Sequence, residues 1–517
     1  MRQRLQLKLL PREAFDSDVI REYIARATGH SETEITGFRP ERRSLDARSR
    51  QPHILLTLEA FIGEPFVESL PERISFPEVS AADRQIVIVG AGPAGLFAAL
   101  RLIERGIRPI LLERGKDIRS RRRDLAALNK EGVINPESNY CFGEGGAGTY
   151  SDGKLYTRST KRGDVRRILN LLVQFGAAPS ILVDAHPHIG TNKLPQIIGA
   201  MRQQIVDCGG IIHFEKKVVD FVLQDQLLRY VRTADGDQFD GDAVILATGH
   251  SASNIFHLLH EQKLLIEVKP FALGVRIEHP QDLIDHIQYK VASPYLPPAA
   301  YSFVEQVDHR GVFSFCMCPG GIIAPAATTE GELVVNGWSP SRRNNPFANS
   351  GMVVSIEEKD MKAFRKDGPL AGLYFQREVE QNAFRAGGGR FVAPAQRMTD
   401  FVEGRLSVDL PDCSYLPGLR SAPLKEVLPG FVWEALRKGF RLFGEKKHGY
   451  FTRDAVVVAT ESRTSSPVRI PRDPERLHHP QVTNLFPCGE GAGYAGGIVS
   501  AAIDGEKVAD QASRCNF

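Results

Sequence analysis

One short stretch of this sequence constrains the fold more than any other. Residues 86–115 read IVIVGAGPAGLFAALRLIERGIRPILLERG. The four β-branched residues 86–89 predict a buried parallel strand. A helix is expected over 93–105, because a glycine follows it where helices commonly end. A second strand over 110–112 leads to Glu113, about 20 positions beyond the glycines. The stretch therefore predicts a complete βαβ unit.

Three glycines between the first strand and the helix follow the spacing G-x-G-x-x-G. Gly90 permits a tight turn, Gly92 lets the backbone approach a pyrophosphate, and Gly95 lets the helix pack close to the sheet. The helix start offers free N–H groups to phosphates, and Glu113 can accept hydrogen bonds from a ribose. The predicted dinucleotide-binding residues of this unit are Gly90, Gly92, Pro93, Ala94, Gly95, Glu113 and Arg114. The alternative is an ordinary strand-to-helix turn.

Two stretches after this unit are candidates for contact with the same ligand. The basic run 114–123 either assists the cofactor phosphates or forms a solvated helix face, and the sequence leaves both open. The stretch 139–155, NYCFGEGGAGTYSDGKL, has too many glycines for regular structure. Its aromatic residues favour a cofactor-lining loop over a mobile surface loop. The predicted ligand contacts in it are Gly143, Gly145, Gly146, Gly148 and Thr149.

Composition places the chain among globular proteins. With 517 residues it is long enough for about three domains. A net charge of +3 with 25% charged residues indicates no particular partner. No stretch approaches the roughly 20 apolar residues of a membrane span. The seven cysteines are scattered and odd in number. Free thiols are typical of a reducing compartment, so we expect a cytoplasmic protein.

A separate N-terminal domain of β-α-β-β order is expected over residues 1–80. An alternating strand comes first, followed by a helix from Asp16 to Gly29 and strands near 35–45 and 53–61. Arginines that could contact RNA or an acidic partner are Arg39, Arg42, Arg43, Arg48 and Arg50. Acids are interspersed, which favours a solvated face and no nucleic-acid partner. The proline-containing stretch 65–82 predicts a linker.

The middle of the chain first extends the nucleotide-binding part and then changes character. A helix over 193–208, a strand over 211–222, a hairpin and a strand over 243–246 lead to Ala247-Thr248-Gly249. Residues 265–455 instead hold short strands with many glycines and prolines. In a strand there, Cys316 and Cys318 would share one face about 6.6–6.8 Å apart, which is long for a disulfide. Packing or a pocket wall is their expected role, with a redox role as the alternative.

The C-terminal part returns to a nucleotide-binding pattern. A short strand over 484–486 is followed by CGEGAGYAGGIVSAAIDG, residues 488–505. The acid Glu490 and a helix entered through Gly496 and Gly497 predict a second helix N-terminus that faces a ligand. A longer ligand with two polar centres would need such a second terminus.

Together these motifs resemble the two-dinucleotide-binding-domain flavoproteins with the glutathione-reductase-like FAD fold. The resemblance implies that the first motif and Glu113 hold the ADP half of FAD. It implies contacts to the rest of the cofactor from Val218, Thr248, Gly249, Gly489, Glu490, Gly497 and Ile498. At position 490 a glutamate replaces the usual aspartate and keeps the acceptor.

More narrowly, five stretches resemble a largely uncharacterised bacterial family of FAD-dependent dehydrogenases. They are RRSLDAR, FGEGGAGTYSDGKL, FALGVRIEHP, FCMCPGG and GEGAGYAGGIVSAAIDG. A second G-x-G-x-x-G for NAD(P)H is missing between 160 and 480, as is C-x₄-C beside the flavin motif. The chain is therefore more similar to the fumarate-reductase-like and amine-oxidase-like branch, in which a separate substrate domain covers the flavin.

We therefore expect an α/β protein with a Rossmann-like FAD-binding domain over 81–264 and 456–517. An α+β substrate domain, 265–455, is inserted into it, and the small βαββ domain precedes it. The expected function is an FAD-dependent oxidoreductase that moves a hydride between flavin N5 and an unidentified small molecule. Candidate catalytic residues are Lys154, Cys318 and Tyr494. The alternatives are an RNA-binding flavoprotein and a non-catalytic FAD-binding protein.

Overall fold

A parallel five-stranded sheet joins distant parts of the chain. The computed structural model describes residues 1–68, 72–157 and 163–515. The strand order is β22-β10-β4-β5-β6. The bounds are β4 Gln85–Val89, β5 Arg108–Leu112, β6 Ile211–His213, β10 Ala243–Leu246 and β22 Leu485–Pro487. All pairs are parallel, so the glycine turn after β4, Thr248 after β10 and Gly489 after β22 meet at one edge. The predicted βαβ unit is confirmed.

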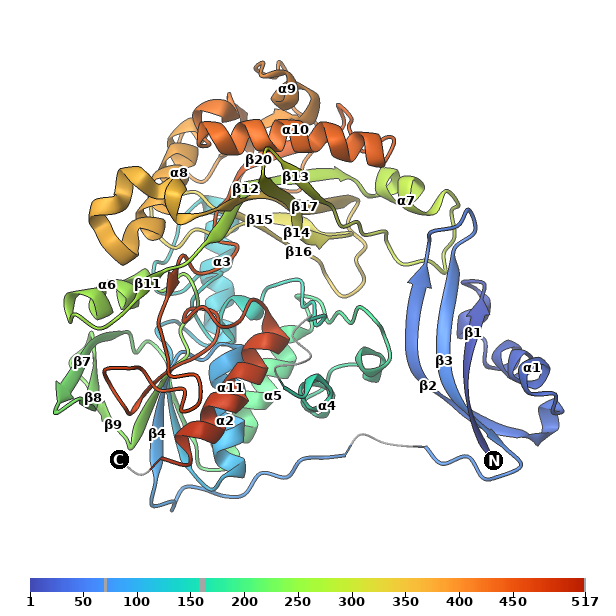
Figure 1. Cartoon of the computed structure of the whole chain (residues 1–517), viewed down its shortest axis with the longest axis horizontal. Helices are drawn as coiled ribbons and strands as arrows, with labels where there is room; N and C mark the ends of the chain where they lie inside the picture. The colour runs from blue at the N-terminus through green and yellow to red at the C-terminus, as the bar shows by residue number, and fades with distance from the viewer. Residues whose placement is uncertain (69–71, 158–162, 516–517) are drawn as a thin grey trace.

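Three helices cover one face of this sheet, and a fourth packs against the last of them within the same apolar core. They are α2 Pro93–Glu104, α4 Val165–Gln174, α5 Leu194–Asp207 and α11 Ile498–Ala512. Figure 1 shows α11, from the C-terminal end of the chain, lying beside α2. The two helices follow parallel strands, so both N-termini lie at the edge where the glycine motifs meet. The predicted helices at 93–105 and 193–208 are therefore confirmed.

The opposite face carries a small antiparallel sheet. It consists of β7 Val218–Gln224, β8 Leu227–Thr233 and β9 Gln238–Asp240, and α6 Ser253–Glu261 packs on β7. The single strand expected over 211–222 is wrong. The backbone turns at Glu215, where φ is 59°, and separates β6 of the parallel sheet from β7. A further helix, α3 Ile118–Glu131, follows β5.

The inserted domain is built on a seven-stranded mixed sheet of order β13-β14-β17-β12-β20-β18-β19. These strands are β12 Phe271–Pro280, β13 Val304–Val307, β14 Arg310–Cys318, β17 Phe347–Ile356, β18 Ala393–Arg397, β19 Leu419–Ser421 and β20 Val456–Glu461. Its helices are α7 Gln281–Tyr289, α8 Ala371–Gly387, α9 Met398–Glu403 and α10 Gly430–Lys446. A hairpin of β15 Ile322–Pro325 and β16 Val335–Trp338 completes it. In Figure 1 the sheet lies above the parallel sheet, beneath α10.

The expected domain boundary between 455 and 456 is misplaced. Strand β20 pairs with β12 and β18, so its residues belong to the inserted domain's sheet. The chain enters and leaves this domain through β11 Glu267–Val268 and β21 Val468–Arg469, which pair antiparallel. The return to the parallel sheet therefore begins after β21.

The N-terminal domain has the predicted β-α-β-β order and contacts both other domains. Its sheet order is β1-β3-β2, and its elements are β1 Arg2–Leu9, α1 Ser17–Thr28, β2 Ile35–Asp46 and β3 His53–Ile62. The Asp16 side chain caps α1, and Gly29 ends it with φ of 74°. Arg43 exchanges backbone hydrogen bonds with Val183 and Ala185, and its side chain pairs with Asp184 at 2.8 Å.

No helix in the described part of the chain is long and apolar enough to cross a membrane.

The variant Gly505→Ala tests the close packing of α11 on α2. A Cβ atom at position 505 would lie 2.2 Å from the carbonyl oxygen of Ala94. We expect overpacking to lower the free energy of unfolding by about 1–3 kcal/mol, measured by thermal or denaturant unfolding. In Gly199→Ala, also helical, the added Cβ meets no atom within 4 Å. This control should be neutral or up to about 1 kcal/mol more stable. Equal stability of the two variants would contradict the packing.

Candidate active site

A cavity of about 1960 Å³ lies between the parallel sheet, the inserted domain and the N-terminal domain. Pockets for single small ligands usually measure about 300–1,000 Å³, so this one has room for a dinucleotide and a second molecule. The N-terminal domain contributes the hairpin residues 43–49 to its wall. Leu45 and Ala47 of this hairpin also pack on the core of the inserted domain. All three domains therefore enclose one space.

Most of the predicted ligand contacts come together on the wall of this cavity. The residues that line it are Gly90, Gly92, Pro93, Ala94, Glu113, Arg114, Gly146, Gly148, Lys154, Val218, Thr248, Gly249, Glu490, Gly497 and Ile498. Those that do not are Gly95, Gly143, Gly145, Thr149, Gly489, Cys318 and Tyr494. All of this second group except Cys318 and Tyr494 were predicted as cofactor contacts. These five residues shape the backbone instead. For example, a Cβ at Gly95 would lie 1.9 Å from the carbonyl oxygen of Gly90.

The carboxylate of Glu113 ties the glycine turn to the glycine-rich loop. Only 5% of this residue is exposed. Its oxygens accept hydrogen bonds from the backbone N–H groups of Ala91 at 3.0 Å, Gly115 at 2.9 Å and Gly143 at 2.9 Å. A carboxylate offers about four acceptor positions. One acceptor position of Glu113 is thus left for the predicted ribose contact. The sequence did not predict the structural role of the other three.

The fully buried Arg121 fixes the rest of this loop. Its guanidinium donates to the backbone carbonyls of Asn139, Tyr140 and Glu144 at 2.8–2.9 Å. Arg121, one member of the basic run, therefore neither contacts cofactor phosphates nor belongs to a solvated helix face. Both interpretations of the run are wrong for this residue. Arg114 pairs with Glu137 and stacks on the ring of Phe142. The loop is thus held from both sides and contains one 3₁₀ turn, Gly146–Gly148.

The residues at the sheet edge fit an extended dinucleotide. Among the residues that the structure describes, no side chain caps the N-terminus of α2 or of α11, so the N–H groups of both first turns are available to a ligand. A Cβ at Gly146 would lie 3.2 Å from Cα of Gly92, so backbone lines the cavity where the two loops meet. The hydroxyl of Thr248 is buried and has no hydrogen-bond partner among the described residues. These features suit an anionic, hydrogen-bonding ligand that spans both helix ends.

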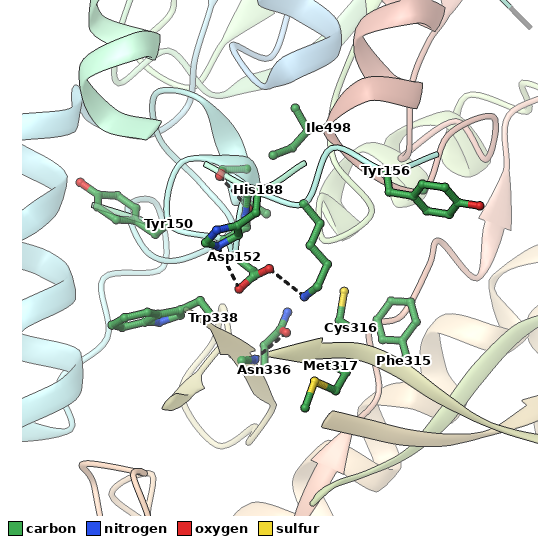
Figure 2. A pocket seen from close by; sticks show the side chains of 18 of the residues that line it. Tyr150, Asp152, Tyr156, His188, Phe315, Cys316, Met317, Asn336, Trp338 and Ile498 are labelled. Carbon is green, nitrogen blue, oxygen red and sulfur yellow. Dashed lines mark hydrogen bonds and ion pairs between the residues drawn. The ribbon is translucent and has the colours of Figure 1, made fainter. Parts of the chain in front are cut away.

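A cluster of charged side chains gathers around Asp152 on the same wall as Ile498 (Figure 2). Its carboxylate lies 2.8 Å from Lys154 Nζ, 3.5 Å from His188 Nε2 and 3.8 Å from the Arg343 guanidinium. Burial opposes the charge on Asp152, but these neighbours outweigh it and hold its pKa far below the usual value. Burial also lowers the pKa of His188, which therefore stays neutral near pH 7.

Lys154 keeps its charge in this cluster. Burial alone would lower the pKa of Lys154, but the negative charges of neighbouring groups, Asp152 among them, outweigh burial and raise the pKa above its ordinary value. Of the three catalytic candidates, Lys154 is the only one that lines the cavity. Sequence reasoning missed Asp152, although it stands two positions before Lys154 in the quoted loop, and it missed His188 and Arg343 on other segments.

The expected common face of Cys316 and Cys318 is wrong. The register of β14 against β17 shifts between Phe315 and Cys318, and Cys316 has φ of 44°. This bulge turns Cys316 into the cavity and leaves Cys318 buried behind the wall. Burial raises the pKa of the Cys318 thiol to about 11, so it is protonated at neutral pH.

Beneath this bulge lies a buried ion pair. Arg276 is fully buried and lies 2.7 Å from Glu461. It also donates to the carbonyl oxygen of Cys316 at 2.6 Å. This donation from the sheet interior supports the bulged conformation.

Tyr494 also lies outside the cavity, contrary to its candidacy as a catalytic residue. The guanidinium of Arg472 lies 3.8 Å from the centre of its ring. Arg472 is in turn paired with Asp504 of α11 at 2.7 Å. Tyr494, in the segment after β22, therefore packs against Arg472. Glu490 does line the cavity, 3.3 Å from Nδ1 of His250.

The fold and the cavity define a dinucleotide-binding α/β protein with an inserted domain, and comparisons identify the dinucleotide. Residues 83–126 match a family described as an FAD binding domain, and residues 270–464 match the C-terminal domain-like family of FAD-dependent proteins. Residues 1–61 match a domain of unknown function. An uncharacterised Clostridium beijerinckii protein is 38% identical over 515 residues, covering 96% of both chains. The chain belongs to the same family as this uncharacterised relative, and the domain families that it matches identify FAD as its cofactor.

Solved flavoenzyme structures show a distant likeness. A triple mutant of the flavin-dependent brominase Bmp2 is 12% identical, with a TM-score of 0.36 over 83% of this chain and 79% of the other. The 2,6-dihydroxypyridine-3-hydroxylase from Arthrobacter nicotinovorans is 13% identical, with a TM-score of 0.35 over 83% of this chain and 81% of the other.

The variant Glu113→Gln tests the hydrogen bonds that join the turn to the loop. One oxygen of Glu113 accepts from two N–H groups and the other accepts from one, so an amide NH₂ would face at least one donor in either orientation. We expect stability to fall by about 1–3 kcal/mol and FAD content to drop, measured by unfolding and by visible absorption. The exposed Glu131→Gln should match the parent. Full FAD occupancy and unchanged stability of Glu113→Gln would contradict this role.

Proposed function

We propose that this protein is an FAD-dependent oxidoreductase acting on a small molecule held between the flavin and the inserted domain. The observation that carries this proposal is the single cavity that joins the glycine turn at Gly92 to the charged cluster around Asp152. A protein that bound FAD only for stability would not need a second volume lined by buried charges. We further propose that the FAD-binding domain is of the glutathione-reductase-like Rossmann type and that the protein is cytoplasmic.

Bound flavin supplies hydride acceptance or donation at N5, and the chain supplies orientation and charge. The proposed cofactor contacts begin at the N-terminus of α2 and end at the N-terminus of α11. The partial positive charge of the α11 terminus, at Gly497 and Ile498, stabilises negative charge that develops beside it. Lys154 holds a proton at Nζ on the same wall. The bulge at Cys316 and the hairpin residues 43–49 form part of the cavity wall.

Three of the five N-terminal arginines named above pair with acids, which gives no support to RNA binding. Arg39 pairs with Glu59, Arg43 with Asp184 and Arg48 with Asp46. Arginines already matched by acids offer little net attraction to phosphates. The position of this domain on the cavity wall instead favours a part in enclosing the substrate. The absence of a nucleic-acid partner stays a prediction.

Anaerobic reduction of the purified yellow protein tests the proposed function. We expect NADH and NADPH to reduce the flavin slowly or not at all, because residues 160–480 contain no second G-x-G-x-x-G. A panel of oxidisable metabolites should contain one that bleaches the flavin rapidly with saturation. The absorbance of the flavin, followed by stopped flow, is the measurement. Rapid saturable reduction by NAD(P)H would contradict the first expectation, and a colourless protein unable to take up FAD would contradict the proposal itself.

The variant Lys154→Met tests whether this charge acts on the flavin. Removing a cation from the chamber wall should make the reduced, more negative cofactor less stable. We expect the two-electron midpoint potential to fall by about 30 mV or more, equivalent to about 1.4 kcal/mol. A dye-coupled spectral titration measures it. Lys130→Met, at an exposed position outside the cavity, should leave the potential unchanged. Equal potentials in both variants would show that Lys154 does not face the flavin.

A further inference from the structure

The cluster around Asp152 carries an unbalanced positive charge inside the chamber. Lys154 and Arg343 are two cations against one carboxylate, and His188 is neutral near pH 7. The side chains of Asp152 and His188 are only 6% and 9% exposed, and those of Lys154 and Arg343 are 34% and 20% exposed. A net charge of +1 in such a partly desolvated place is costly unless an anion completes it. The cluster thus lacks one negative charge.

Arg343 is held in place by an unusual backbone. Its φ of 49° lies in the left-handed region, which is strained for an arginine. A Cβ at Gly320 would lie 1.7 Å from the carbonyl oxygen of Arg343, so only glycine permits the two backbone segments to lie this close. The Nε atom of Arg343 is buried and has no hydrogen-bond partner among the described residues. Strain that persists around an incompletely paired guanidinium is typical of a ligand contact.

Several apolar side chains stand on the wall beside the charged cluster, together with the polar Asn336. Phe315, Met317 and Trp338 stand around the charged cluster in Figure 2, with Tyr156 to one side. Three more cations line the cavity without an acidic partner among the described residues, namely Lys290, Arg342 and Lys447. Cations along the walls of a cavity raise the local concentration of anions.

We propose that the substrate is an organic anion whose carboxylate-like group is received by Arg343 and Lys154, with its apolar body against Phe315, Met317 and Trp338. This substrate class rests on the proposed oxidoreductase function. Arg343 is the principal receptor, because its planar guanidinium matches a carboxylate with two hydrogen bonds. Asp152 competes with the substrate for both cations and keeps them in position when the chamber holds no anion.

The test uses the FAD-loaded full chain and simple monocarboxylates as probes. Acetate, benzoate and 4-phenylbutyrate are titrated at constant ionic strength, and binding is followed by flavin difference spectra and by calorimetry. The corresponding primary amides have the same shape without the charge. We expect benzoate or phenylbutyrate to bind with saturation, and at least tenfold more tightly than its amide. Equal binding of acids and amides, or no saturable binding of any acid, would overturn the proposal.

Two arginines provide a matched pair of variants. Arg343→Gln should weaken carboxylate binding at least tenfold and leave amide binding and FAD content unchanged. Arg365→Gln, at an exposed position outside the cavity, should change carboxylate affinity less than twofold. Asp152→Asn removes the competing carboxylate and should tighten carboxylate binding severalfold, whereas a merely structural role for Asp152 would weaken it.

The outcomes separate this inference from the proposed function. Loss of FAD from Arg343→Gln would show that the guanidinium holds the cofactor, and equal effects of Arg343→Gln and Arg365→Gln would show a general effect of protein charge. Either result overturns the inference. A parent protein that binds FAD and is reduced by a metabolite, but ignores carboxylates, would refute the anionic substrate while leaving the oxidoreductase function intact.

Discussion

The close approach of backbone to backbone at one sheet edge is the constraint on which this structure depends. Added Cβ atoms at Gly95, Gly491 and Gly505 would lie 1.9–2.2 Å from carbonyl oxygens of Gly90, Thr248 and Ala94. At separations this small, any residue with a Cβ atom would be destabilising. They allow β4, β10 and β22 to end side by side while α2 and α11 pack in contact. The cofactor site can form only because these distant segments approach so closely.

The inserted domain depends on a different kind of interaction, a fully buried ion pair. Burial opposes charge on both Arg276 and Glu461, yet each meets the other at 2.7 Å. Such a pair adds little net stability, but removing one partner typically costs about 3–5 kcal/mol. Its value here is geometric. Arg276 reaches the carbonyl of Cys316, so the pair in the sheet interior sets the shape of the chamber wall.

The sequence was most informative where one local pattern decides the outcome. Strand, glycine turn, helix and Glu113 were placed correctly because turn chemistry and helix termination act over a few residues. Predictions failed where long-range pairing overrides the local pattern. The sequence of β20 fits either domain, and only its pairing with β12 and β18 assigns it to the inserted domain. The alternation around Cys316 predicted a regular strand, but the register shift against β17 removed the common face of the two cysteines.

The charged cluster was beyond prediction for a related reason. Asp152, His188 and Arg343 come from segments that have no shared motif, and only the folded chain brings them within 4 Å. Their role is electrostatic, and it depends on all of these side chains together. Asp152 satisfies Lys154 and Arg343 in part, so the cations stay charged and correctly placed without being neutralised. A cavity wall built this way favours an anion at the place where apolar side chains and cations come together.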